Sequence, residues 1–265
     1  MTSTDLALSA RGVRMEYRDR SSDTSLVAVE NVDLDVADGE FVSLLGPSGC
    51  GKSTFLKIIN GLLKATAGEI KLRSVVKGRE DAMVFQDSAL FPWYSVLDNV
   101  AYGLVCAGVP RKEARKRASP FIDLVGLQGF GGKYPYQLSG GMQQRANLAR
   151  ALAVDSAILL MDEPFASLDA QTRELMQSEL LRIWNAAKKT VVFVTHQIDE
   201  AVYLSDRVIV MAPRPGRIIA DIHIDLPRPR QLSIKRSPEF ATYENDIWRL
   251  IAGHQQATAD PVQSA

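Results

Sequence analysis

The 265-residue sequence has few of the residues that build metal sites and disulfide frameworks, with two cysteines and three histidines. Cys50 and Cys106 lack the spacing of metal ligands and the number that a disulfide scaffold needs, which suits a reducing cytosol. An excess of one charge sign is also missing, because 31 Lys and Arg residues balance 31 Asp and Glu residues. The composition therefore does not indicate a nucleic-acid surface.

Long hydrophobic runs and a secretion signal are absent as well. No stretch approaches the ~20 uninterrupted apolar residues of a membrane-spanning helix, and the first residues lack the basic start and apolar run of a signal peptide. Hydrophobic residues still make up 46% of the chain and charged residues 23%. We expect a soluble chain with a large core, organised as one α/β domain or a domain with a small appendage.

The most specific pattern is at residues 41–54, where a short apolar run breaks at Gly46. The spacing that follows is G-x-x-x-x-G-K-S, the phosphate-binding loop that connects a strand to a helix. Its glycines let backbone N–H groups surround an anion, and the next helix, expected over 53–63, directs its positive end at the same anion. Lys52 would contact the β- and γ-phosphates, and the Ser53 hydroxyl would bind Mg²⁺. The predicted nucleoside triphosphate site comprises Gly46, Pro47, Ser48, Gly49, Cys50, Gly51, Lys52, Ser53 and Thr54.

Strand and helix patterns surround this loop in the order expected of an α/β core. Alternating apolar residues predict strands at 13–17 and 32–36, and nearly continuous apolar runs predict buried parallel strands at 157–161 and 190–195. Between about 90 and 155 the periodicity is helical, which indicates an inserted helical subdomain. The other expected segments are a frayed start at 1–10, a polar loop at 18–25, strands at 68–72, 82–85, 207–211 and 217–224, helices at 170–187 and about 237–252, and a disordered polar tail at 253–265.

Polar residues follow three of the predicted core strands. Asp162 and Glu163 end the run at 158–161, and since successive strand side chains point to opposite sides, one can reach Mg²⁺ while the other faces an attacking water. His196 follows the strand at 190–195, and Gln86 follows the strand at 82–85. The carboxyl ends of strands in α/β sheets are where ligands bind, so we expect functional roles for these residues.

The segment Leu138–Arg145, Leu-Ser-Gly-Gly-Met-Gln-Gln-Arg, resembles the signature sequence of the ATP-binding cassette (ABC) family, whose ATPase subunits carry the motifs above in the same order. The likeness extends from about Val13 to Ile251. It implies a P-loop NTPase core with an N-terminal antiparallel β subdomain and an inserted α-helical subdomain, forming a single ATPase domain over 1–252. It also implies hydrolysis of ATP with Mg²⁺ as cofactor.

The resemblance gives a role to each matching residue. Tyr17 would stack on adenine, and Gln86 would touch Mg²⁺ and the lytic water. Asp162 would hold Mg²⁺, Glu163 would be the general base and His196 the γ-phosphate switch. The residues expected to act across a dimer are Ser139, Gly140 and Gly141, which form an amide-rich helix start suited to phosphate, and Asp169, which would communicate between subunits.

The signature and the phosphate loop imply a dimer, because in the family each ATP lies between the phosphate loop of one subunit and the signature of another. The chain carries one copy of each motif. The second ATPase subunit would be an identical copy or a paralogue.

A narrower likeness to the nitrate, sulfonate and taurine importer ATPases lies at residues 91–100, 134–137, 212–217 and 235–240. It implies a peripheral protein on the cytoplasmic face of the cell membrane, bound to a permease through the region around Trp93. An external solute-binding protein would be engaged indirectly, and no nucleic acid would be bound. The sequence departs from this group in two places. The segment 73–80 is shorter than the strand and loop that the group usually has there, and Gln197 replaces the aspartate that usually follows the switch histidine.

Two other kinds of protein share part of this pattern, and the stretch around Trp93 is compatible with two environments. A soluble ABC ATPase acting on nucleic acid or the ribosome usually carries two cassettes or a long coiled-coil insertion, and a P-loop kinase would not explain residues 138–145. The aromatic stretch around Trp93 could be a buried segment. An exposed patch is favoured, because such patches mark interfaces and aromatic residues dominate interface energetics.

Overall fold

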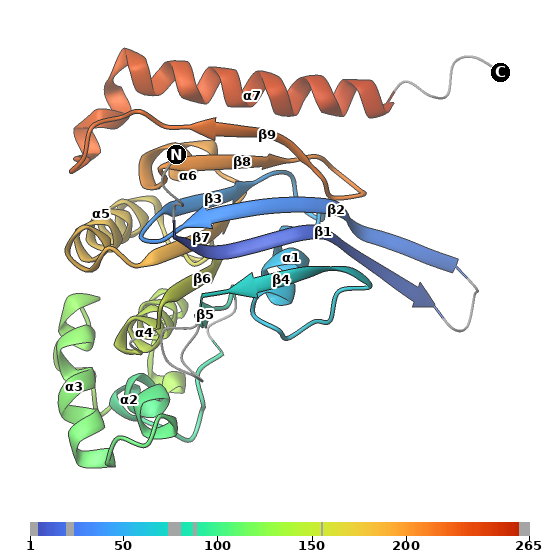
Figure 1. Ribbon diagram of the computed structural model, residues 1–265. Coiled ribbons are helices and arrows are strands. Elements are labelled where there is room, and N and C mark those ends of the chain that lie inside the picture. The colour runs from blue at the N-terminus through green and yellow to red at the C-terminus, as the bar shows by residue number, and fades with distance from the viewer. Residues whose placement is uncertain (1–4, 20–23, 74–80, 87–88, 155, 260–265) are drawn as a thin grey trace. The chain divides into compact units, whose positions relative to one another are not determined.

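The computed structural model of the protein describes residues 5–19, 24–73, 81–86, 89–154 and 156–259. The chain divides into two compact units, the first formed by residues 1–73 with 188–265 and the second by residues 74–187 (Figure 1). Parts of four sequence expectations lie outside the described residues: the frayed start at 1–4, the polar loop at 20–23, the short segment at 74–80 and the tail at 260–265.

The first unit holds two sets of paired strands. β1 pairs antiparallel with β2 and β4, in the order β2-β1-β4. β3 lies between the parallel strands β7 and β8, and β9 pairs antiparallel with β8. Every residue of β3 and β7 is buried, as expected for parallel strands covered on both faces. The strands are β1 Leu6–Asp19, β2 Thr24–Ala37, β3 Phe41–Leu45, β4 Ala67–Leu72, β7 Thr190–Thr195, β8 Arg207–Met211 and β9 Ile218–His223.

The helices of the first unit include a long C-terminal helix, α7 (Figure 1). Phe240 and Ile247 are its buried anchors. Its neighbours include α6, a short helix that the sequence analysis missed, and the 3₁₀ turn η2. The bounds are α1 Lys52–Ile59, α6 Ile198–Leu204, η2 Leu232–Arg236 and α7 Pro238–Ala259.

Three sequence expectations for the first unit are wrong. Residues 6–10 are not frayed, because Leu8 and Ala10 are buried between β2 and β4. The helix after the phosphate loop ends at Ile59 rather than 63, where Gly61 takes a φ of 78°. The expected disorder from 253 is contradicted by α7, which continues to Ala259. Alanine and glutamine favour helix there, and the next proline comes only at Pro261.

The second unit contains the predicted helical segments and two strands. β5 and β6 pair in parallel, with Val84 opposite Met161. The helices α2, α3 and α4 pack on one another. Among the described residues of the whole chain, none of the helices combines the length and apolar character needed to span a bilayer. The elements are β5 Asp81–Val84, α2 Val96–Cys106, α3 Arg111–Leu124, η1 Pro135–Gln137, α4 Gly140–Ala153, β6 Ile158–Asp162 and α5 Ala170–Ala187.

A buried arginine, Arg230, ties the segment before η2 to the first unit. Its guanidinium donates to five backbone carbonyls at distances of 2.7–3.4 Å. Burial lowers the pKa of Arg230 to about 10, because the charged form loses hydration. The accepting carbonyls belong to Val202, Tyr203, Ser205, Ile224 and Leu226.

A carboxylate, Asp98, joins α2 to α3 in the second unit. It accepts hydrogen bonds from the hydroxyl of Ser95, the N-cap of α2, and from Arg111 and Arg115 of α3. The bonds from Arg115, Ser95 and Arg111 lower the pKa of Asp98 to about 2. The ionised carboxylate therefore stabilises the packing of these two helices.

Replacing Arg230 with methionine should lower the free energy of unfolding by about 2–4 kcal/mol, because five carbonyls lose their donor while the apolar volume is kept. Chemical denaturation measures this. Arg249→Met on α7 is the matched control, because Arg249 is mostly exposed and forms a surface ion pair with Asp246. Equal small effects of the two substitutions would contradict the assigned role of Arg230.

Replacing Asp98 with asparagine should lower the free energy of unfolding by about 1–2 kcal/mol at pH 7. The folded pKa lies below the ordinary value of 3.8, so the stabilisation is present above that value and is lost as the pH falls through about 2. Denaturation from pH 6 to pH 2 should therefore show wild type and variant converging. A difference independent of pH would contradict this account.

Candidate nucleotide-binding and catalytic site

The phosphate loop connects β3 to α1 through a backbone that leaves no room for side chains at two glycines. A Cβ at Gly46 would lie 2.7 Å from the Met211 carbonyl oxygen, and one at Gly51 would lie 2.5 Å from the Ala28 carbonyl oxygen. Gly51 also has a φ of 100° and precedes α1 without a side-chain cap. The loop thus presents backbone at a helix start, the arrangement that binds phosphate.

Lys52 is buried within the loop. Its ammonium donates to the carbonyl oxygens of Gly46 at 2.7 Å and Pro47 at 2.9 Å, and lies 3.7 Å from the Cys50 sulfur. Cys50 is buried as well. A buried ammonium held by neutral carbonyls lacks a compensating negative charge in these bonds, so an anion entering the loop would be strongly attracted.

The turn between β8 and β9 packs against the phosphate loop. Gly216 exchanges backbone hydrogen bonds with Ala28 and Glu30 of β2, and a Cβ at Gly216 would collide with the Cys50 carbonyl. The exposed side chain of Arg214 donates to the Gly49 carbonyl at 3.2 Å. Residues 212–217, where the sequence resembles the importer ATPases, therefore form a segment that supports the phosphate loop.

His196 and Tyr17 belong to the same unit as the phosphate loop. Thr195 pairs with Leu45 in the parallel ladder of β7 and β3. His196 and Gly46 are consequently the next residues at the same edge of the sheet, and His196 is exposed. Tyr17, 41% exposed, lies on β1, two residues beyond Met15, whose partner Val29 approaches Gly51. The fold thus brings both residues to the neighbourhood of the loop.

The second unit brings Gln86 and the two carboxylates together. β5 and β6 are parallel and in register, so the residues after them meet at one edge. The Gln86 side-chain nitrogen lies 3.5 Å from Oε2 of Glu163. Asp162 is buried, while Glu163 is half-buried and has a φ of 45°. A positive φ in a non-glycine residue is uncommon and clusters at functional sites.

The signature segment lies beside the turn that carries Asp169. Ser139 is exposed and caps α4 by accepting the Met142 N–H. A Cβ at Gly141 would lie 3.3 Å from the Leu168 side chain, next to Asp169. Asp169 accepts the Thr172 N–H at the start of α5 at 3.0 Å, and backbone N–H bonds of this kind lower its pKa. Ser139 and Asp169 thus sit on adjoining helix starts.

Polar residues of α4 hold the segment around Gln86, and the sequence analysis missed their role. The side-chain amides of Gln144 and Asn147 each donate to the Phe85 carbonyl at 3.2 Å, and Arg150 donates to the Ala89 carbonyl at 2.8 Å. Gln144 and Asn147 are buried. Their signal in the sequence is a pair of amides three residues apart in an otherwise apolar helical stretch, which on its own is weak.

An aromatic platform, defined as Phe91, Trp93, Tyr94 and Tyr102, lies at the start of the helical part of the second unit. The ring centroids of neighbouring members are 4.6–6.4 Å apart. The buried side chain of Asn99 shapes the turn beneath it through bonds to Phe91, Tyr94 and Ser95. Trp93 is 66% exposed, which confirms the predicted exposure and excludes the buried alternative.

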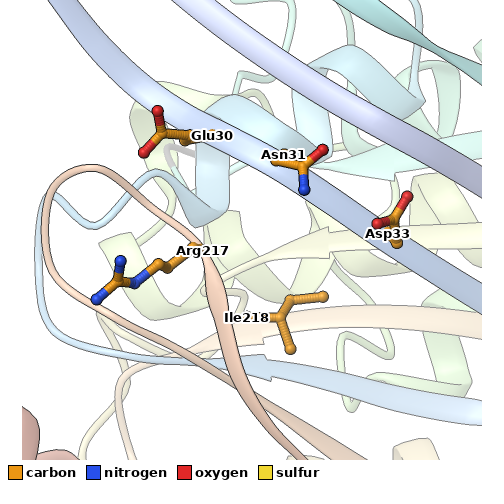
Figure 2. Close-up of a pocket in the computed structure, with 5 residues that line it drawn as sticks. All are labelled: Glu30, Asn31, Asp33, Arg217 and Ile218. Carbon is orange, nitrogen blue, oxygen red and sulfur yellow. The ribbon is translucent and has the colours of Figure 1, made fainter.

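A separate open hollow of about 430 Å³ lies on the first unit. Figure 2 shows Glu30, Asn31 and Asp33 along β2 facing Arg217 and Ile218. None of these residues belongs to the predicted nucleotide site. Within the described parts of the chain, no group of three or more His, Cys, Asp or Glu side chains forms a cluster able to hold a metal.

The chain matches known proteins over most of its length. A family model described as ABC transporter matches residues 29–166. An uncharacterised ABC transporter ATP-binding protein of Methanocaldococcus jannaschii is 53% identical over 84% of both chains. A taurine import ATP-binding protein of Rhizobium johnstonii is 49% identical over 83% of this chain and 87% of its own.

The fold also matches a solved structure. A dimeric ATP-binding cassette bound to ADP and Pi superposes with a TM-score of 0.75 at 33% identity, covering 83% of this chain and all of that one. The predicted P-loop NTPase architecture is confirmed by this likeness together with the observed strand and helix order. With the phosphate loop, the carboxylate pair and the signature in their expected places, the chain belongs to the ABC transporter family.

Proposed function

We propose that the chain is the ATP-binding and ATP-hydrolysing subunit of an importer for a small solute of the taurine type. The observation that carries this is the phosphate loop, with Lys52 buried inside it and with glycines where no side chain fits. Family membership and the import function of a relative 49% identical support the transport role. The name of this relative favours an importer over a soluble ATPase acting on nucleic acid or the ribosome.

The residues of the first unit would bind ATP. The backbone of the phosphate loop and the start of α1 would surround the phosphates, and Lys52 would exchange its carbonyl partners for phosphate oxygens. Tyr17, exposed near the loop, would stack on adenine. His196, at the same sheet edge, would contact the terminal phosphate.

The residues of the second unit would carry out hydrolysis. Glu163 would accept the proton of the attacking water, and Gln86, 3.5 Å from it, would orient that water. Gln86 and Asp162 carry oxygen donors that suit Mg²⁺, as does Ser53 of the phosphate loop in the first unit. The metal would neutralise the charge developing on the phosphates. We assign Asp162 to the metal because it is the last residue of β6, next to Glu163, and because carboxylate oxygens are ligands that Mg²⁺ prefers.

The complete assembly would contain two ATPase subunits and a permease on the cytoplasmic face of the membrane. The dimeric relative supports a second subunit, whose ATP would meet Ser139, Gly140 and Gly141 while Asp169 contacts the neighbouring copy. Amide groups at the start of α4 suit phosphate for the same reason as those of α1. The aromatic platform would bind the permease, since exposed aromatic clusters mark interfaces. The external solute-binding protein would act through the permease.

Replacing Glu163 with glutamine should lower ATP turnover by about 10²-fold or more, because an amide cannot accept the water proton. ATP affinity should stay near the wild-type value, since the phosphate loop is unchanged. Phosphate release and nucleotide titration measure the two quantities. Glu179→Gln on α5 is the control, because Glu179 is half-buried, as Glu163 is, and bonds to Arg182. Turnover within about twofold of wild type in Glu163→Gln would remove Glu163 as the base.

Replacing Trp93 with alanine should weaken binding to the permease by about 2 kcal/mol, or roughly 30-fold in Kd, if Trp93 is a hot spot. The ATPase activity of the isolated subunit should be retained, because Trp93 is 66% exposed and contributes little to the core. Trp248→Ala on α7 is the matched control, with 62% exposure on the other unit. Equal permease affinity of both variants would reject the platform as the docking site.

A further inference from the structure

A single hydroxyl fixes the backbone on both sides of His196. Thr195 Oγ1 accepts the N–H of Gln197 at 3.0 Å, so the chain forms a tight turn that has His196 at its centre. The same hydroxyl donates its proton to Oε2 of Glu200 at 2.7 Å. The backbone of His196 is therefore coupled to the carboxylate of Glu200 through the Thr195 hydroxyl.

Glu200 is placed for this role by the start of α6. Gln197 is the N-cap of α6, and its side chain makes no capping bond. Glu200 is then the third helical residue, where a glutamate ordinarily bonds directly to the N-cap N–H in a capping box. Here the Thr195 hydroxyl is inserted between the two groups. The helix start and the strand end thus share one hydrogen-bond chain that runs from Glu200 through Thr195 to Gln197.

The bond from Thr195 to Glu200 is a strong constraint. Glu200 is 3% exposed and Thr195 is 1% exposed, so water is largely excluded from both. A hydrogen bond to a buried carboxylate is shorter and stronger than one between neutral groups, and its loss leaves a desolvated charge with one partner fewer. The orientation of the Thr195 hydroxyl is therefore set by Glu200.

A second contact holds α6 in place independently of this chain. Asp199, the neighbour of Glu200, accepts a hydrogen bond from Lys235 of η2 at 3.0 Å. Ala201, Val202, Tyr203 and Leu204 are fully buried and anchor the helix by packing. The hydrogen bonds of Thr195 and Glu200 are thus not needed to dock α6. These hydrogen bonds instead fix the turn at His196.

We propose that Glu200, acting through Thr195, is a positioning residue that holds His196 at the edge of the phosphate loop. Thr195 lies opposite Leu45 in the ladder, so a shift of this turn moves the imidazole relative to Gly46 and the phosphates. Misplacement of a reacting group by about 1 Å can cost about 10²-fold in rate. Glu200 and Thr195 are both buried, so their effect on turnover would pass through His196. The proposal rests on the proposed role of His196 in the nucleotide site.

The kinetic test compares variants that keep or remove the hydroxyl. Thr195→Val is nearly isosteric and should lower the turnover number by about tenfold or more while leaving the KM for ATP within about twofold. Thr195→Ser keeps the hydroxyl and should retain at least about a third of the wild-type turnover. Glu200→Gln should lie between them, because the amide still accepts a hydrogen bond but without charge. Asp199→Asn, on the same turn of α6, should match wild type.

A spectroscopic test reports on His196 directly. The chain has three histidines, His196, His223 and His254, so the imidazole signals can be assigned by single substitutions in an NMR spectrum. Thr195→Val and Glu200→Gln should shift the His196 signals and leave those of His223 and His254 in place. Thr195→Ser and Asp199→Asn should leave all three unchanged.

The outcomes separate this inference from the function on which it rests. Reduced turnover with shifted His196 signals in Thr195→Val, and recovery in Thr195→Ser, support the positioning role. Unchanged His196 signals, or shifts of all three histidines with a lower melting temperature, overturn it. Wild-type turnover in His196→Ala would remove the role of His196 itself. Loss of turnover in His196→Ala but not in Thr195→Val would overturn the positioning role alone.

Discussion

The close approach of three backbone segments around the phosphate loop is the constraint on which the first unit depends. Gly46 lies against the Met211 carbonyl, Gly51 against the Ala28 carbonyl, and Gly216 against the Cys50 carbonyl. A side chain at any of these positions would separate the segments, because a Cβ within 3 Å of a carbonyl oxygen cannot be accommodated. The packing of β2, β8 and the β8–β9 turn therefore fixes the backbone path of the loop. Its N–H groups stay oriented for phosphate.

Polar side chains play the corresponding role in the second unit. Gln144, Asn147 and Arg150 of α4 hold the carbonyls of Phe85 and Ala89, so the helix that begins at the signature is bonded to the segment that carries Gln86. Buried amides must be paired, and this requirement fixes the position of α4 relative to that segment. A nucleotide-dependent movement of Gln86 would consequently shift α4 and the Ser139 at its start. This contiguous network gives a physical route between the two motifs.

The aromatic platform shows how a local device exposes residues that would otherwise be buried. Asn99 uses its oxygen and nitrogen to satisfy the backbone of the turn from Phe91 to Ser95. The turn therefore does not need to fold into the core to pair its polar groups. Phe91 becomes the inner member and Trp93 the outer one.

Local sequence determined the elements whose signal lies within a few residues. The glycine spacing at 46–51, the apolar runs of β3, β6 and β7, and the helical periodicity of α2 to α5 each predicted the observed element closely. The family likeness rested on short motifs of the same kind, and the comparisons confirm it. The local signal misled at the chain ends, since the pairing of Leu8 and Ala10 with β2 and β4, like the extension of α7, was not visible in short windows.

Only the tertiary structure decided which polar residues act together. Thr195 and Glu200 are ordinary residues in the sequence, and their hydrogen bond becomes apparent only when α6 folds back beside the end of β7. The donors that converge on Phe85 lie about 60 residues from it along the chain. Arg230 likewise binds carbonyls of two separate segments. Hydrogen bonds between distant segments depend on burial and on the positions of both partners, and a sequence pattern of strands and helices specifies neither.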